Sequence, residues 1–370
     1  MGRGGALSGV RVIEFAGLGP GPFCGMMLAD LGADVVRIDR PGADPDALGH
    51  RVMGRGKRSI LLDLKAEEGR ARAFALVSRA DLLIEGFRPG VMERLGLGPE
   101  QALAANPALV YGRMTGWGQD GPRAREAGHD IDYIALTGAL HAIGGADGPV
   151  PPLNLLGDFG GGALYLAVGL LAGLHHARVT GEGQVVDAAI VDGTVHLTAM
   201  IRDLRGAGQW RDGRGANLLD GGAHFYRCYA CGDGRWIAVG AIEPQFYAAF
   251  RAGLGLDDPI FDRQNDRALW PELSARVAAV IARHPRAHWL EVFAGTDACV
   301  APVNDWDEAA RDPHMAARGV FVDGPLGPEP APAPRMSRTP GSVGRASPAP
   351  GADTIQVLRD WLAEEGERAR

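Results

Sequence analysis

The chain has 370 residues, of which 46% are hydrophobic and 22% are charged. This balance is typical of a folded globular protein and excludes a disordered chain. The formal net charge is −7, which disfavours a nucleic-acid-binding protein because such proteins usually carry a basic surface. An anionic ligand would need Arg and Lys gathered locally, because the overall charge does not attract it.

Neither export nor a membrane span is predicted. Residues 1–7 lack the apolar core of a secretory signal peptide. The longest apolar run, residues 163–174, is too short to cross a bilayer and predicts a buried helix. Cys228 and Cys231 have the spacing of a zinc or redox pair, but no second pair of zinc ligands accompanies them. We interpret both as small hydrophobic residues of a strand. We expect a cytoplasmic protein without a metal site.

Strand-like and helix-like segments alternate through the first 115 residues. The strands are expected at 10–15, 34–38, 59–62, 81–85 and 108–113, and the helices at 22–31, 66–78 and 99–106. This alternation predicts an α/β fold with a Rossmann-like, doubly wound parallel sheet. Further along, helices are expected at 163–174 and 191–202, with a strand at 184–188 between them.

Two domains are expected. A large Rossmann-like domain over residues 1–205 is followed by a Gly-rich linker over 206–222 and a small α+β domain over 223–324. The small domain opens with a predicted hairpin over 225–240. The predicted helices of this domain cover 245–254, 269–284 and 287–293. A Pro-rich tether over 323–351 and a last helix over 354–365 follow, so that residues 325–370 complete the large domain.

The turn after the first predicted strand is not a dinucleotide-binding fingerprint. Gly17 and Gly19 match its first two glycines, but Pro22 stands at the third position, where it removes an N–H and blocks close packing. The second strand ends at Asp39, and Arg40 follows it. An Arg at this place suits a ribose phosphate, such as that of CoA, better than a free hydroxyl. A nicotinamide-dependent dehydrogenase is therefore disfavoured.

Seven stretches of the sequence point to one family. They cover residues 17–24, 29–42, 55–65, 86–96, 128–133, 156–162 and 240–247. Together they resemble the class III CoA-transferase superfamily and, within it, the α-methylacyl-CoA racemases. The resemblance extends over nearly the whole chain. The pair His129-Asp130 and the segment 243–247 are the features that mark the racemase branch.

The resemblance implies epimerisation of 2-methyl-branched acyl-CoA thioesters between (2R) and (2S), by removal and return of the α-proton through an enolate. His129 and Asp158 match the two proton carriers. Glu243 matches a carboxylate that supports the His from the partner subunit of an interlocked homodimer. Asp130 is expected to orient its neighbour. N–H groups at the start of the helix after Asp158 are candidate donors to the enolate oxygen.

The same resemblance implies a CoA site on the large domain. The matching positions are Arg40, Leu62, Asp63, Leu64, Lys65, Gly86, Phe87, Arg88 and Arg94. Gly86 stands where Asn is usual in the family. CoA is part of the substrate, so no separate cofactor is expected, and neither are nucleic-acid or membrane partners.

Imidazole and carboxyl groups suit this chemistry, since inversion needs one base on each face and the two can exchange roles. Taken singly, however, His129, Asp158 and Glu243 could each only cap a helix. Lys57, Arg58 and Lys65 could only be solvated face charges. Two other functions stay open: CoA transfer between carboxylic acids, in which Asp158 is the nucleophile that forms an anhydride and then a thioester, and a CoA-thioester-binding scaffold protein.

Overall fold

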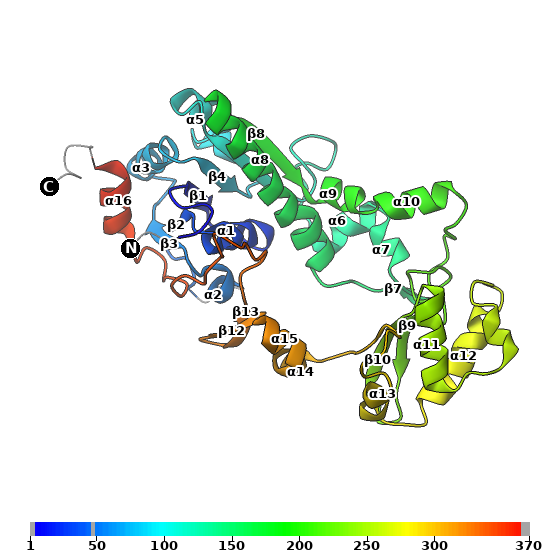
Figure 1. Ribbon diagram of the computed structural model, residues 1–370. Helices are drawn as coiled ribbons and strands as arrows, with labels where there is room; N and C mark the ends of the chain where they lie inside the picture. Colours follow the sequence, from blue (N-terminus) through cyan, green and yellow to red (C-terminus); the bar gives the residue numbers. More distant parts are fainter. Residues whose placement is uncertain (1–3, 46–48, 364–370) are drawn as a thin grey trace. The chain divides into compact units, whose positions relative to one another are not determined.

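The computed structural model describes residues 4–45 and 49–363 (Figure 1). The chain divides into two compact units. Unit 1 contains residues 1–137, 152–198 and 319–370, and unit 2 contains residues 138–151 and 199–318.

The predicted linker over 206–222 is an ordered part of unit 2. The side chain of Asn217 is buried there and donates hydrogen bonds to the carbonyls of Arg211 and Gly213 and to the carboxylate of Asp220. These contacts fold the Gly-rich stretch into a compact loop, which its polar composition did not reveal. Residues 138–151, predicted to lie in the large domain, also belong to unit 2.

Unit 1 is built on a six-stranded parallel sheet with the strand order β3-β2-β1-β4-β5-β8. The strands are β1 (Arg11–Phe15), β2 (Asp34–Asp39), β3 (Arg58–Leu61), β4 (Leu82–Glu85), β5 (Val110–Thr115) and β8 (Gln184–Ala189). All six predicted strands are present, so the doubly wound α/β fold is confirmed. The winding reverses between β1 and β4, which is where ligands bind in sheets of this kind.

Hydrophobic helices cover both faces of this sheet. Neighbouring residues of β1 point to opposite cores: Val12 packs into the cluster that contains helix α8, and Ile13 packs into the cluster that contains helix α3. The helices and 3-10 or π segments of unit 1 are α1 (Pro20–Asp30), α2 (His50–Met53), α3 (Glu67–Val77), α4 (Val91–Arg94), α5 (Pro99–Ala105), α6 (Asp130–Leu136), η1 (Leu155–Ala163), α8 (Leu164–Thr180), α9 (Ile190–Leu197) and α16 (Thr354–Leu362).

A π-helix, η1, precedes α8, and the sequence did not predict it. Its glycines permit a close crossing with α9: a Cβ on Gly161 would lie 2.5 Å from Thr194 Oγ1, and a Cβ on Gly193 would lie 1.9 Å from the carbonyl oxygen of Gly161. The Gly-rich sequence is therefore explained by two helical backbones in direct contact, as only Gly permits.

Segments η1 and α8 form one helical stretch, Leu155–Thr180, which is longer than the predicted run. By length and composition alone this stretch could cross a membrane, with a mean hydropathy of 1.6 in its most apolar window. Leu166, Leu170 and Leu174 are buried in the core beside the sheet. One side of the stretch therefore packs on the sheet, and 39% of its most apolar window is buried.

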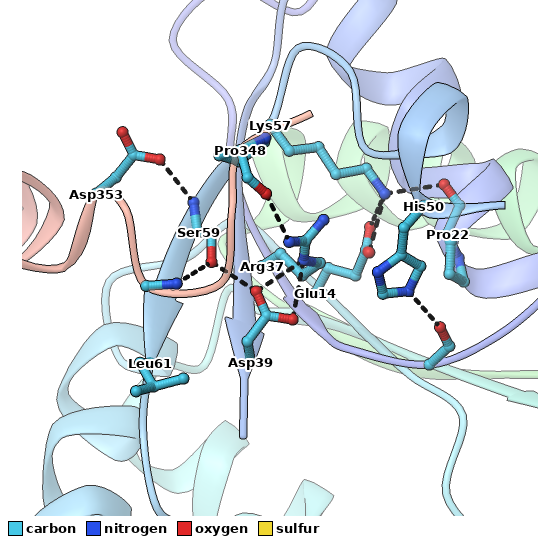
Figure 2. A network of polar contacts seen from close by, with 12 residues as sticks. Glu14, Pro22, Arg37, Asp39, His50, Lys57, Ser59, Leu61, Pro348 and Asp353 are labelled. Atoms are coloured by element: carbon cyan, nitrogen blue, oxygen red, sulfur yellow. Dashed lines mark hydrogen bonds and ion pairs between the residues drawn. The ribbon is translucent and has the colours of Figure 1, made fainter. Parts of the chain in front are cut away.

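The C-terminal segment returns to unit 1 and is tied to β2 and β3 (Figure 2). Arg37 donates to the carbonyl of Pro348, and the N–H of Ser59 donates to Asp353. The carboxylate of Asp39 accepts from Arg37 and from the hydroxyl of Ser59. Asp39 is thus fully used inside the protein, which further disfavours its binding a cofactor ribose. The segment begins with a hairpin of β12 (Phe321–Gly324) and β13 (Gly327–Pro330).

Unit 2 contains a three-stranded antiparallel sheet in the order β11-β10-β9. The predicted hairpin is formed by β9 (Tyr226–Ala230) and β10 (Trp236–Gly240), and β11 (Val300–Pro302) was not predicted. The other elements are α7 (Ala139–Ala142), β6 (Gly144–Gly145), β7 (Gly148–Pro149), α10 (Ala199–Gly206), α11 (Pro244–Leu254), η2 (Pro259–Asp262), α12 (Trp270–Ile281), α13 (Arg286–Val292), α14 (Trp306–Arg311) and α15 (Pro313–Arg318). Cys228 is exposed on β9, Cys231 is buried just after it, and both are free thiols.

His224 makes the stability of unit 2 sensitive to acid. The Tyr247 hydroxyl donates to the carbonyl of Phe261, so Nε2 of His224 donates to this hydroxyl, and Nδ1 is buried without a partner among the described residues. Burial lowers the pKa of His224 to about 4. The unfolded chain therefore takes up a proton as the pH falls from about 6.5 towards 4 while the folded chain does not.

We expect this difference to remove about 3 kcal/mol of stability by pH 4. Urea unfolding across this pH range would measure it. His224→Gln keeps a hydrogen-bonding side chain but cannot titrate, so its stability should fall less steeply with acid. Identical pH slopes for the two proteins would contradict the assignment.

Candidate active site

The residues predicted to bind CoA lie at the carboxyl edge of the parallel sheet. Arg40 follows β2, residues 62–65 follow β3, and residues 86–88 follow β4. The carboxyl ends of parallel strands share one edge of the sheet, so these loops are neighbours. The side chain of Leu62 is buried in the core and cannot reach a ligand. Of this residue, only the backbone is available to CoA.

Four cations surround this edge: Arg40, Lys65, Arg88 and Arg94. All four are exposed, and none of them forms an ion pair with another residue in the described part of the chain. The Asp63 carboxylate accepts the N–H of Lys65, which shapes the loop. The protein therefore presents local positive charge despite its net negative charge, as binding of phosphate groups requires.

His129 is the N-cap residue of α6, where its N–H donates to the Asp132 carboxylate over 3.0 Å. His129 therefore occupies a helix-capping position, which was the alternative role considered for it from the sequence. Its side chain is exposed. Asp158 lies on η1 in the same unit and is half-buried. The electrostatic influence of His129 reaches its carboxyl group. The two predicted proton carriers thus lie within electrostatic reach of each other, and no hydrogen bond or ion pair joins them among the described residues.

Burial raises the pKa of the Asp158 carboxyl, and the negative charge of Asp130 acts in the same direction. The amide of Asn154, 3.4 Å from Oδ2, and the nearby His129 oppose this shift. A carboxyl group with a raised pKa is a better match for an imidazole, because proton exchange between two groups is efficient when their pKa values are close.

Asp130 orients the acid rather than the imidazole. Its Oδ1 accepts the backbone N–H of Asp158 over 2.7 Å. A Cβ on Gly157 would lie 2.3 Å from the same oxygen, so the approach requires glycine at this position. The sequence predicts that Asp130 orients its neighbour His129, whereas the contact that the structure shows is with the backbone of Asp158, 28 residues further along the chain.

The helix that carries Asp158 begins at Leu155, before Asp158 and not after it. Of the N–H groups predicted after Asp158 as donors to an enolate oxygen, that of Phe159 donates to the carbonyl of Asn154. The N–H of Asp158 itself donates to Asp130. The first turn of a helix leaves N–H groups without acceptors in that helix, and the first turn of α6 lies directly after His129.

The loop over residues 17–21 lies close to Asp158, which the sequence did not indicate. Gly19 has φ +66°, and a Cβ at this position would lie 3.1 Å from Asp158 Oδ2. Figure 2 shows what holds the loop: Nε2 of His50 lies 3.4 Å from the carbonyl oxygen of Gly17, and Lys57 donates to the carbonyl of Pro22 over 2.9 Å. A positive φ is hard to infer from sequence, although a Gly before Pro at a strand end is consistent with it.

Gly19→Ala is expected to lower turnover about 10- to 100-fold, since a methyl group would both strain the backbone and displace the Asp158 carboxylate. Affinity for CoA should change much less. Gly9→Ala is the matched control, because Gly9 also has a positive φ but nothing lies within 4 Å of its Cβ position. Steady-state kinetics of both variants would measure the difference, and equal losses would contradict it.

Lys57 is not a solvated face charge. It is fully buried and donates to both carboxylate oxygens of Glu14, which is also fully buried (Figure 2). Gly25 of α1 lies directly over the pair, since a Cβ there would be 1.8 Å from Glu14 Oε2.

Glu243 belongs to unit 2, where it is the N-cap residue of α11 before Pro244. Its exposed side chain makes no capping hydrogen bond. Within the described residues its carboxylate forms no ion pair either. Glu243 therefore does not cap α11 with its side chain, and its carboxylate is available for other contacts.

Comparison with known proteins gives consistent results. The family model for CoA-transferase family III matches residues 7–354. The chain is 48% identical to alpha-methylacyl-CoA racemase of Mus musculus over 96% of this chain and 93% of the relative, and 45% identical to that of Homo sapiens over the same shares. It is 33% identical to succinyl-CoA–D-citramalate CoA-transferase of Chloroflexus aurantiacus over 96% and 94%.

Among solved structures, a CAIB/BAIF family protein from Brucella suis has a TM-score of 0.84 at 26% identity, covering 96% of this chain and 99% of its own. Both the structural match and the sequence match extend over nearly the whole chain. The protein therefore belongs to CoA-transferase family III.

Proposed function

We propose that this protein is an isomerase that epimerises 2-methyl-branched acyl-CoA thioesters between (2R) and (2S). The observation that carries the proposal is that His129 and Asp158 lie within electrostatic reach of each other in one unit that also presents unpaired cations for CoA. Two relatives, 48% and 45% identical to this chain, bear the name alpha-methylacyl-CoA racemase, which supports the same function.

The reaction removes the single α-proton from one face of the α-carbon and adds a proton to the opposite face. One of the two groups removes the α-proton and leaves an enolate, and the other group returns a proton to the opposite face. In the reverse direction their roles exchange. Burial favours the protonated form of Asp158, which prepares it to donate. Only a proton is transferred, so the proposal needs no cofactor besides the CoA of the substrate.

Incubation with pure (2R)-2-methylacyl-CoA in D2O, followed by NMR of the α-proton, tests this proposal. Loss of the α-proton with formation of the other epimer, in the absence of a carboxylate acceptor, is the expected result. An unchanged α-proton, with exchange of CoA only after an acceptor is added, would instead mean a transferase with Asp158 as nucleophile. CoA binding without either reaction would mean a scaffold protein.

We also propose a homodimer in which Glu243 supports His129 of the partner subunit. Large apolar side chains of unit 1 are exposed, among them Leu164, Val168 and Leu197 at 44%, 67% and 46%, and a second chain would cover such a surface. The free carboxylate of Glu243 is consistent with a contact outside its own unit.

Co-expression of two inactive chains, His129→Ala and Glu243→Ala, tests this arrangement. If Glu243 acts across subunits, the mixed dimer contains one site with both residues intact, and activity returns. If Glu243 acts within its own chain, both sites of the mixed dimer lack a residue and activity stays absent. Analytical ultracentrifugation of the wild type supplies the oligomeric state. The cytoplasmic location stays a prediction.

A further inference from the structure

Glu85 ends strand β4 at the base of the loop over residues 86–90, and it is fully buried. Both of its carboxylate oxygens are used. Oε1 accepts from Arg113 Nε over 3.0 Å, and Oε2 accepts the backbone N–H of Phe87 over 2.7 Å. Glu85 and Arg113 are paired in the register of β4 and β5. The carboxylate therefore ties the start of the loop to the neighbouring strand.

Arg113 also holds the other end of this loop. Its Nη1 donates to the carboxylate of Glu93 over 2.9 Å, and Glu93 lies on α4, directly after the loop. Between the two attachments the chain turns at Gly90, which has φ +85°. One guanidinium group thus fixes both ends of the segment that presents the exposed cations Arg88 and Arg94.

Burial raises the pKa of Glu85 to about 7, against the opposing effects of the Phe87 N–H and Arg113. The titratable and charged groups around it are Arg113 and Tyr111 on β5 and Glu93 on α4. A protonated carboxyl carries an O–H on one oxygen, and that oxygen no longer accepts well from an N–H donor. Protonation therefore weakens either the attachment to Phe87 or the attachment to Arg113.

We propose that Glu85 is a positioning residue which, together with Arg113, sets the 86–90 loop for CoA and releases it on protonation, so that affinity for CoA falls in mildly acidic solution. The proposal rests on the proposed function only in placing CoA at this loop. It does not depend on whether the bound thioester is epimerised or transferred.

Titration calorimetry with dephospho-CoA at about pH 8 and about pH 6 tests the proposal. This probe lacks the 3′-phosphate, whose own titration near pH 6 would mask the effect. Wild-type affinity is expected to fall roughly fivefold at the lower pH, as for the loss of about one hydrogen bond. Glu85→Gln should bind weakly at both pH values, since its amide nitrogen faces a donor, and should show no such pH dependence.

Glu93→Gln is the matched control: it alters the same Arg113 but keeps both contacts of Glu85, so the pH dependence should persist. A second measurement needs only the wild type. With ¹⁵N-labelled phenylalanine, the amide resonance of Phe87 should shift with a midpoint near neutral pH. This signal reports the carboxylate directly, even if Glu85→Gln does not fold.

A pH dependence that survives in Glu85→Gln, or a Phe87 amide that does not shift near neutral pH, would overturn the proposal. Absence of binding of both dephospho-CoA and CoA by the wild type would overturn it together with the CoA site. If the wild type shows the expected fall in affinity at the lower pH but catalyses no epimerisation, only the proposed function is contradicted.

Discussion

His129→Ala is expected to abolish epimerisation, a loss of about 10²- to 10⁴-fold, because one face of the α-carbon then has no group to move its proton. Asp158 remains, and it can still remove and return the proton on its own face. In D2O the variant should therefore exchange the α-proton of one epimer for deuterium without inverting it. NMR of both epimers, incubated separately, measures exchange and inversion together.

Asp158→Asn should give the mirror result, with exchange confined to the other epimer. His175→Ala is the control, because His175 is exposed on α8, away from the proposed chemistry. Wild-type interconversion by His129→Ala would refute the two-base mechanism. Loss of all exchange in Asp158→Asn, with no effect of His129→Ala on CoA transfer, would favour the transferase alternative.

Lys57→Met is expected to destabilise unit 1 by about 3–5 kcal/mol, since it leaves the buried carboxylate of Glu14 without its partner. The midpoint of urea unfolding measures this loss. In the double variant Glu14→Leu/Lys57→Met most of the stability should return, because no buried charge is left unpaired.

Arg72→Met is the matched control for this prediction. Arg72 forms an exposed pair with Glu68 on α3, and such pairs contribute at most about 0.5 kcal/mol. If Arg72→Met and Lys57→Met lose similar amounts of stability, breaking the buried Glu14–Lys57 pair destabilises the protein no more than breaking an exposed pair. A double variant no more stable than Lys57→Met would show that the loss arises from packing instead of charge.

The six-stranded sheet could be predicted because its signals are local. Short β-rich runs separated by turns and amphipathic helices are visible within a few residues of each strand, and the parallel sheet follows from their alternation. The hairpin of β9 and β10 was likewise indicated by the Gly-rich turn between its strands. Short elements such as β11 gave no comparable signal.

The features that the sequence did not reveal depend on contacts between distant residues. The π-helix η1 is accompanied by the crossing of Gly161 and Gly193. The burial of Lys57 depends on Glu14, 43 residues earlier. The spacing of hydrophobic residues along the sequence does not indicate either contact.

The candidate site divides in the same way. Arg40 could be placed at a strand end from the sequence itself, and the resemblance to a family supplied Lys65, Arg88, Arg94, His129 and Asp158. The attachment of Asp130 to the Asp158 backbone could not be predicted, because it depends on where η1 begins. The same holds for the position of Gly19, since loop conformation follows from packing that one sequence does not display.

The attachment of the C-terminal segment to β3 constrains how the chain folds during synthesis. Strand β3 lies at an edge of the sheet, and the residue that donates its N–H to Ser59 Oγ is 292 positions further along the chain. At about 5–20 residues per second, a ribosome needs roughly 15–60 s to make that stretch. Unit 2 is synthesised in this interval. The β3 edge remains uncovered during this time, because the segment that covers it has not yet been made. An uncovered edge can pair with another chain, so throughout this interval the nascent protein is exposed to aggregation at β3.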